Sequence, residues 1–216
     1  MNVATVDGPK LADILQGLAL KLEENKDYLC ELDSEVGDGD HGVSMTIGMR
    51  AVRSNLAALS DATLEGAFRA VSEAFADEVG ASIGPLYEAA FDAAADTVAG
   101  TDEIADAETW ARVLDVMTRA MQKVGKAEPG DKTLIDAWLP AAEAAASGEG
   151  KGVSETLEAA STAAWAGVEK TKDLIPKRGR ASRLGERARG YQDAGATSAS
   201  ILLEALYEGV AGVANH

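Results

Sequence analysis

The stretch SEVGDGDHG, residues 34–42, concentrates acidic side chains in a glycine-rich turn. With the preceding residue it places Asp33, Asp38 and Asp40 in the spacing D-x4-D-x-D. Carboxylate oxygens are hard ligands suited to Mg²⁺ or Ca²⁺, and glycines let a turn fold several of them onto one ion. Acidic turns of this kind are also common as solvated surface loops. The spacing alone therefore leaves a metal site and a solvated loop both open.

A calcium-binding EF-hand is excluded by the register. Counted from Asp38, the twelfth position is Met49, and counted from Asp33 it is Ser44, where a bidentate glutamate is required. Mg²⁺ is the better candidate, because a few carboxylates hold it while phosphate oxygens and water complete its octahedron. His41 follows directly, and Gly42 opens an expected helix whose free N–H groups could receive a phosphate.

A second glycine-rich stretch, GASIGPLY, could present backbone donors to phosphate. Gly80, Ser82 and Gly84 precede Pro85, a residue apt for the first turn of a helix. The same stretch is equally compatible with a simple turn between helices. No Walker A sequence occurs, and no parallel-sheet pattern accompanies these loops, so ordinary P-loop and Rossmann sites are rejected.

A basic segment, PKRGRASRLGERARG, reverses the acidic balance of the chain. Six basic residues fall within thirteen positions, against the single acid Glu186: Lys177, Arg178, Arg180, Arg183, Arg187 and Arg189. Arginine suits phosphate oxygens because its planar fork binds them bidentately. We therefore interpret the segment as a basic loop that closes over a phosphorylated ligand or meets a partner, and single out Arg180. Other arginines here are expected to be solvated surface.

The chain as a whole is acidic, with a formal net charge of −16 and a pI near 4.5. This balance disfavours a nucleic-acid partner, since such binding relies on Lys and Arg that neutralise phosphates. No run approaches the roughly 18 apolar residues of a membrane span. The N-terminus lacks the features of a secretory signal, and Cys30 is the only cysteine, so we expect a cytoplasmic protein.

The elements that must position these loops are helical nearly everywhere. One buried face is expected from the i, i+3, i+4, i+7, i+11 spacing of Leu11, Ile14, Leu15, Leu18 and Leu22. A second comes from Trp110, Val113, Leu114, Met117, Met121 and Val124. Alanine, the best helix former, dominates the long segments between them, and convincing strand signals are missing.

We expect a single all-α domain over residues 1–216, because no linker rich in Pro, Gly or Ser divides the chain. Asp61, Asp106, Asp131 and Ser154 are expected as helix N-caps. Glycines gather in four inter-helix stretches, residues 37–42, 80–85, 125–130 and 178–196, which suggests one shared site at one end of a bundle. About eight helices are predicted, over residues 8–30, 42–59, 63–79, 84–100, 107–125, 131–147, 153–175 and 196–213.

Four motifs together resemble one known family. LDSEVGDGDHG, GASIGPLY, GKAEPGDKTLIDAW and GRASRLGERARGYQDAGATS occur in the order found in the nucleotide-binding L subunit of dihydroxyacetone kinase. The resemblance runs from about residue 10 to the C-terminus. It implies a barrel of eight antiparallel helices with the nucleotide, ADP or ATP, at one end.

The resemblance also implies roles for particular residues. Asp33, Asp38 and Asp40 match carboxylates that hold two Mg²⁺ ions bridging the phosphates. The remaining matches surround the nucleotide: the helix start His41, Gly42, Val43 and Ser44; the second phosphate loop with Ser82 and Ile83; Gly125; Leu134 as an apolar surface for the base; the transition-state-stabilising Arg180; and the contact loop Asp193, Ala194 and Gly195.

Two positions depart from the family pattern. Ile83 stands where a small residue is usual, and Ala194 replaces the proline of an Asp-Pro-Gly loop. Neither change removes a functional group, so both bear on pocket shape rather than on binding mode. No catalytic residue is assigned in this chain.

The resemblance further implies partners. The substrate, dihydroxyacetone or a related short ketose, is held on a separate K subunit, and a homodimer or a heteromeric complex is expected. The phosphoryl donor is either exchangeable ATP or a bound ADP that a phosphoenolpyruvate-dependent phosphotransferase-system protein rephosphorylates. The alternative function is a nucleotide-loaded regulatory module that acts on a transcription regulator.

Overall fold

The chain is helical throughout the computed structural model, which describes residues 5–80, 83–148 and 152–214. These ranges hold nine α-helices, one 3₁₀ helix and two strands of two residues each. The elements are β1 (Val6–Asp7), α1 (Gly8–Glu24), α2 (Lys26–Val36), α3 (His41–Ala58), α4 (Leu64–Glu78), α5 (Ile83–Val98), β2 (Glu103–Ile104), α6 (Ala107–Gly125), α7 (Ile135–Ala146), α8 (Val153–Thr171), η1 (Arg180–Ala188) and α9 (Ala194–Ala214).

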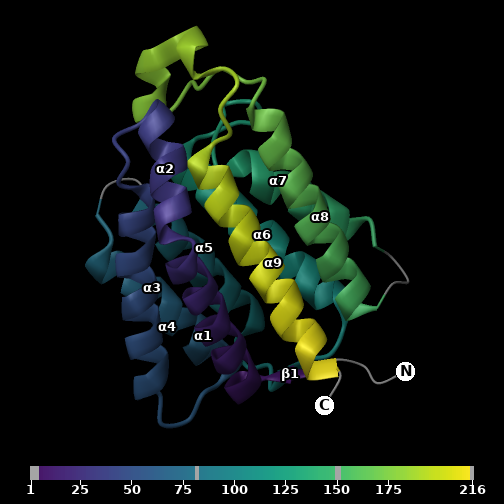
Figure 1. Cartoon of the computed structure of the whole chain (residues 1–216). Coiled ribbons are helices and arrows are strands. Elements are labelled where there is room, and N and C mark those ends of the chain that lie inside the picture. The colour runs from purple at the N-terminus through teal and green to yellow at the C-terminus, as the bar shows by residue number, and fades with distance from the viewer. Residues whose placement is uncertain (1–4, 81–82, 149–151, 215–216) are drawn as a thin grey trace.

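Eight of the helices form a closed ring. Each helix from α3 to α9 packs against the next in sequence, and α1 closes the ring by packing against both α9 and α3. Neighbouring helices run in opposite directions (Figure 1). The predicted all-α barrel of antiparallel helices is therefore confirmed. The helix α2 lies outside the ring, where it contacts α3 and α9.

The apolar faces expected from the spacing fill the barrel interior. The five α1 residues Leu11, Ile14, Leu15, Leu18 and Leu22 are all buried, and Trp110 on α6 is fully buried. Val124 does not follow this pattern. It lies one turn beyond Met121, near the end of α6, and is 46% exposed.

The helix boundaries differ from the expectation in informative places. The predicted helix 8–30 is two helices that meet at Asn25, and the second continues to Val36, so Asp33 belongs to a helix rather than to the turn. The predicted helix 131–147 begins only at Ile135. Residues 130 and 132 have positive φ, which helical backbone does not adopt, so the chain remains a loop there.

Only one of the four expected N-caps is correct. Asp106 accepts the N–H of Thr109 and caps α6. Thr63, not Asp61, caps α4, and Gly152, not Ser154, precedes α8. Asp131 is not a cap, because its side chain is buried and engaged with residues far along the chain.

A small sheet occurs at the end of the barrel opposite the site. The strands β1 and β2 pair antiparallel, with Val6 opposite Ile104 and Asp7 opposite Glu103. Two residues per strand give no alternating pattern, which is why the sequence did not reveal them. No helix within the described ranges is long and apolar enough to cross a membrane.

Candidate functional site

Four loops that the sequence singled out meet at one end of the barrel. Because the helices alternate in direction, α3, α5, α7 and α9 all begin at this end, at the top of Figure 1. A helix N-terminus carries unpaired N–H groups and a partial positive charge, so it favours anions. The topology therefore directs four such termini toward one place in a protein that is strongly acidic overall.

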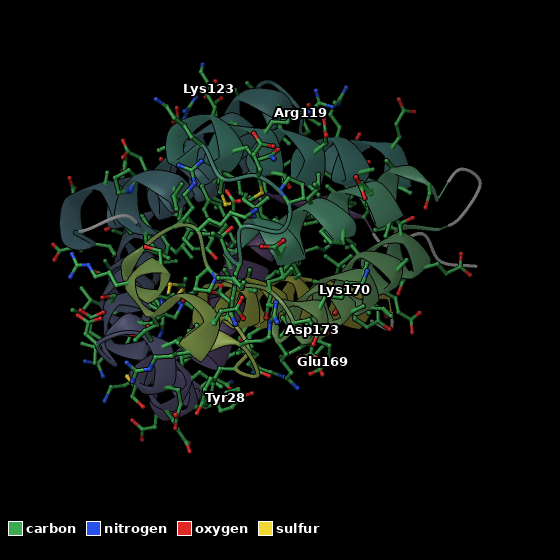
Figure 2. The ribbon with its side chains drawn as sticks, turned by 90° about the horizontal axis from the view of Figure 1, so that it is seen from above. Tyr28, Arg119, Lys123, Glu169, Lys170 and Asp173 are labelled. Carbon is green, nitrogen blue, oxygen red and sulfur yellow. The ribbon has the colours of Figure 1, made fainter. Side chains whose placement is uncertain are left out.

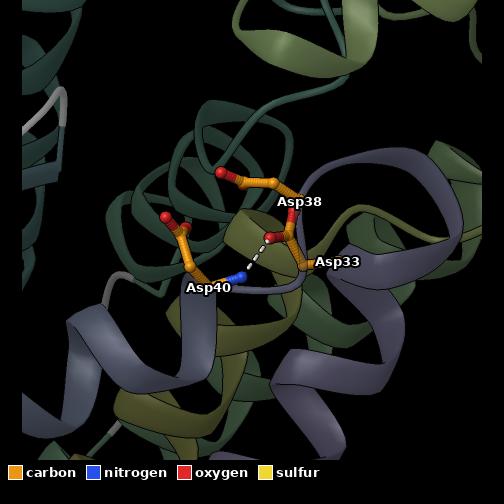
Figure 3. Close-up of side chains that lie close together, drawn as sticks. All are labelled: Asp33, Asp38 and Asp40. Atoms are coloured by element: carbon orange, nitrogen blue, oxygen red, sulfur yellow. Dashed lines mark hydrogen bonds between the residues drawn. The ribbon is translucent and has the colours of Figure 1, made fainter.

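The acidic turn brings its three carboxylates together. One oxygen from each of Asp33, Asp38 and Asp40 lies within 4.8 Å of the others (Figure 3). Asp33 extends from the last turn of α2, Asp38 from the connection and Asp40 from the residue before α3. Three carboxylate oxygens this close repel one another unless a cation lies between them, and the set suits a hard dication such as Mg²⁺.

The corner between α2 and α3 is held by Asp33 and by a close helix approach. The Oδ2 atom of Asp33 accepts the N–H groups of Asp40 at 3.0 Å and His41 at 3.3 Å. Gly42 lies so near α2 that a Cβ atom there would be 2.0 Å from the carbonyl oxygen of Lys26. Glycine at position 42 thus lets α3 begin directly beside the carboxylates.

His41 links the start of α3 to the start of α9. Its Nε2 atom lies 2.9 Å from Ser198 Oγ, and that hydroxyl donates to the carbonyl of Gly195 at 3.0 Å. The ring nitrogen and the hydroxyl can each serve as the donor in this contact, depending on the tautomer of His41. Burial lowers the pKa of His41 below its usual value, and the nearby Asp33 carboxylate opposes this shift. The ring is therefore held neutral.

Beside the carboxylates lies a cleft of about 380 Å³, a size typical of small-molecule sites. Its lining combines charged and polar residues with apolar ones. The polar residues are Asp33, Asp38, Asp40, His41, Ser44, Lys132, Thr133, Arg178 and Asp193, and the apolar residues include Ile83, Leu86, Met121, Ala127, Leu134 and Ile135. A ligand with a polyanionic part and a flat apolar part matches this composition.

Asp193, directly before α9, is a half-buried residue on the cleft wall. It accepts the N–H of Ala196 at 2.7 Å. Burial raises its pKa to about 7, with the Asp136 and Asp33 carboxylates adding to the shift, while the Ala196 N–H and Lys132 oppose it. The structure thus places beside the acidic turn another carboxyl group, whose pKa lies near neutral pH.

The structure brings most of the expected site residues to this cleft. Ten of them line it: Asp33, Asp38, Asp40, His41, Ser44, Ile83, Gly125, Leu134, Asp193 and Gly195. Gly42 and Ala194 do not, and Val43 is 42% exposed. Ser82 lies outside the described residues, and so does the side chain of Arg180. Its neighbours Arg178, Gly179 and Ala181 reach the cleft.

Two buried charged residues that the sequence analysis missed lie in the loop GKAEPGDKT, and one of them, Lys132, lines the cleft. Lys132 is 2% exposed and Asp131 is 4% exposed, unusual values for charged side chains. Asp131 had been expected as a helix cap, and Lys132 had no expected role. Their position within the motif GKAEPGDKTLIDAW was the only sign in the sequence that they matter, because burial cannot be deduced from residue type.

The molecule is thus an all-α barrel whose loops form a cleft with a cluster of carboxylates at one end. The DAK2 domain model matches residues 35–208. At the sequence level, the chain is 36% identical over 96% of its length to the PEP-dependent dihydroxyacetone kinase 2, ADP-binding subunit DhaL, of Listeria innocua, covering 97% of that protein. It is also 35% identical to the corresponding subunit of Escherichia coli K12, covering 83% of this chain and 86% of that one.

Solved structures agree with the sequence comparison. The crystal structure of the dihydroxyacetone kinase of C. freundii in native form matches 94% of this chain with a TM-score of 0.72 and 26% identity. The same kinase in complex with AMP-PNP and Mg²⁺ gives a TM-score of 0.70. This chain spans only 35% and 34% of those two longer chains. The protein belongs to the DhaL family of dihydroxyacetone kinase subunits.

Proposed function

We propose that this protein is the ADP-binding subunit of a dihydroxyacetone kinase, which carries a phosphoryl group on a Mg²⁺-bound nucleotide to a ketose held by a separate K subunit. The observation that carries the proposal is the convergence of Asp33, Asp38 and Asp40 at the mouth of the cleft, beside the start of α3. The crystal structure of the related C. freundii kinase with AMP-PNP and Mg²⁺ supports it.

The acidic turn would hold two Mg²⁺ ions. When bound, Mg²⁺ offsets the negative charge of phosphate oxygens and polarises them, as in other phosphoryl-transfer sites. The chain itself contributes the carboxylate ligands, and Asp33 also fixes the start of α3 by accepting the N–H groups of Asp40 and His41. Phosphoryl transfer relies on positioning and charge neutralisation more than on covalent chemistry. No general base in this chain is therefore required.

The apolar residues of the cleft would receive the nucleobase. Leu134 is 6% exposed and lies between the loop 125–133 and α7, and Ile135, Met121 and Leu86 extend the same surface. The branched Ile83 adds to this wall at the start of α5. Ala194, where the family resemblance implies proline, begins α9, and Asp193 still accepts the Ala196 N–H.

The phosphoryl donor is proposed to be a phosphoenolpyruvate-dependent phosphotransferase protein, with ADP retained as a bound coenzyme. Relatives of matching length are named PEP-dependent or PTS-dependent subunits. By contrast, the erythrulose kinases that this chain resembles are about three times longer, since it covers 33% and 31% of two of them. A reducing cytoplasm, expected from the single cysteine, is the proposed location.

Analysis of the nucleotide that co-purifies with the protein tests this proposal. The protein is purified without added nucleotide, dialysed, denatured, and the released molecules are identified by chromatography and mass spectrometry. Stoichiometric ADP is the expected result. An empty site that binds ATP with Mg²⁺ would contradict the retained-coenzyme donor, and a site that binds neither would contradict nucleotide binding altogether.

A second assay separates the kinase from the regulatory alternative. The phosphoryl group of the loaded protein is followed in the presence of a K subunit and dihydroxyacetone. Transfer to the ketose is expected. Tight nucleotide binding without any transfer would instead favour the regulatory module.

A further inference from the structure

The segment between α8 and α9, residues 172–193, lies over the end of the barrel that carries the cleft (Figures 1 and 2). It contains η1 and all five arginines of the basic segment. Its residues Arg178, Gly179 and Ala181 form part of the cleft wall. Apart from Ala188, which is buried, the side chains described within η1 are half-buried or exposed. Packing of apolar side chains therefore contributes little along η1 itself.

A single buried lysine holds both ends of this segment. The Lys132 ammonium donates to the carbonyl oxygens of Leu174 at 3.3 Å, Ala188 at 2.6 Å and Tyr191 at 2.7 Å. An ammonium has three N–H donors, so each one has a backbone acceptor here. Leu174 precedes η1, whereas Ala188 ends it and Tyr191 follows it. Lys132 thus links the chain that leads into η1 to the chain that leaves it.

The preceding residue holds the same segment through its charge. Asp131 accepts from Lys177 Nζ at 3.1 Å and from Arg178 Nε at 3.2 Å, and its own carbonyl accepts the Lys177 N–H at 3.0 Å. Arg178 also donates to the carbonyl of Lys126 at 2.5 Å. The Asp131 carboxylate is itself fixed by the N–H of Glu128 at 3.0 Å.

The backbone at this position is strained, which indicates that the arrangement is specified rather than incidental. Lys132 has a φ of +60°, in the left-handed region that favours glycine. This conformation costs about 1 kcal/mol for a residue with a Cβ atom. It persists where surrounding contacts fix it, and here those contacts are the three carbonyls and the neighbouring ion pairs.

We propose that Asp131 and Lys132 form a clamp that holds residues 174–191 closed over the cleft and thereby slows nucleotide release. The clamp is a positioning device: Lys132 acts through the backbone of the segment, and Asp131 acts through Lys177 and Arg178. The part of this inference that concerns nucleotide release rests on the proposed function, whereas the clamp itself does not.

The test compares Lys132→Met with the matched control Lys172→Met. Methionine removes the three donors but keeps an unbranched side chain of similar length. Lys172 lies at the end of α8, and the charge of its exposed side chain pairs only with Glu169 in the described part of the chain, so its loss leaves the clamp intact. A third variant, Asp131→Asn, weakens the other half of the clamp and serves if Lys132→Met does not fold.

The first measurement is limited proteolysis of the nucleotide-free protein with an arginine-specific protease. None of these substitutions removes an arginine, so all variants keep the same cleavage sites at Arg183, Arg187 and Arg189. Cleavage within the segment should become about tenfold faster in Lys132→Met, because hydrogen bonds to a charged group are lost. It should stay at the wild-type rate in Lys172→Met. Equal rates in Lys132→Met and wild type would overturn the clamp.

The second measurement is the dissociation rate of a fluorescent ADP analogue in the presence of Mg²⁺. Release should also be about tenfold faster in Lys132→Met or Asp131→Asn, and unchanged in Lys172→Met. Faster cleavage without faster release would overturn the role in nucleotide retention. If the wild-type protein binds no nucleotide, the proposed function fails, while the proteolysis still decides whether the clamp exists.

Discussion

The carboxylate of Asp33, in the last turn of α2, accepts the backbone N–H groups of Asp40 and His41, where α3 begins. Asp33 is a proposed metal ligand, and its Oδ2 atom therefore also accepts hydrogen bonds at the start of α3. Its Oδ1 atom remains for an ion. The side chains of Asp38 and Asp40 are exposed and take no part in this link. The three carboxylates are expected to respond differently to substitution.

Asp38→Asn should weaken Mg²⁺-dependent ADP binding by at least about tenfold, because one charged ligand of the ion is lost. The unfolding temperature of the nucleotide-free protein should not fall, since the side chain is exposed. Calorimetric titration and thermal unfolding measure the two effects. Glu35→Gln is the matched control, because Glu35 is an exposed neighbour outside the cleft lining. A similar loss of binding in both variants would mean that net charge, not ligation, is responsible.

Asp33→Asn should lose both Mg²⁺-dependent binding and some stability. The amide oxygen can still accept the two N–H groups, but without the negative charge that favours a helix start. A loss of about 0.5–1 kcal/mol in the free energy of unfolding is expected. Urea unfolding of Asp33→Asn beside Asp38→Asn measures it. Identical stability of the two variants would show that the link from Asp33 to α3 contributes nothing.

Removal of Mg²⁺ should abolish the stabilisation that ADP gives. A ligand that binds only the folded state raises the free energy of unfolding by about 2.7 kcal/mol at 100 times its dissociation constant. Unfolding curves are recorded with ADP alone, Mg²⁺ alone, both, and both with excess EDTA. Only the third condition should shift the transition strongly. An equal shift with ADP alone would contradict this prediction, because it would show that ADP binds without a metal ion at the acidic turn.

Gly84→Ala should destabilise the start of α5. A Cβ atom at this position would lie 1.8 Å from the carbonyl oxygen of Val79, so the connection from α4 must move. We expect a loss of about 2–3 kcal/mol, typical of overpacking in a close contact. Gly80→Ala, four residues earlier, is the control, because no atom of the described residues outside its chain neighbours lies within 4 Å of its Cβ position. Equal losses in urea unfolding would contradict the argument.

Tyr87→Phe should change stability in alkali. Burial raises the pKa of Tyr87 to about 12, whereas an unfolded tyrosine ionises near 10. The stability that the neutral phenol contributes is full below pH 10 and is lost as the pH rises toward 12, because only the unfolded state releases its proton in that interval. Tyr87→Phe should therefore lose less stability than wild type between pH 10 and 12.

At neutral pH the same substitution should leave stability unchanged or slightly higher. Among the described residues, no group meets hydrogen-bond geometry with the buried Tyr87 hydroxyl. Removing an unsatisfied buried polar group is not costly. Tyr191→Phe, at an exposed side chain, provides the control in both pH ranges. If Tyr87→Phe follows the wild-type alkaline profile, the raised pKa of this residue is wrong.

Much of this molecule follows from local sequence. The helical class, the buried faces of α1 and α6 and the N-cap at Asp106 depend on residue type and spacing within one element, and each is confirmed. The four glycine-rich stretches also indicated a common site. Because helices in the ring alternate in direction, loops that are far apart in the sequence meet at one end. The residues that hold metal and nucleotide remain predictions.

The tertiary structure alone decided the roles of Asp131, Lys132 and Asp33. A buried lysine cannot be recognised from its residue type, since lysine is normally exposed, and the three carbonyls that accept from Lys132 lie 42 to 59 residues further along the chain. Asp33 likewise seemed part of a loop until α2 was found to extend to Val36. Local propensity and spacing act over a few residues, whereas the burial and partners of a charged side chain are fixed only when distant segments pack together.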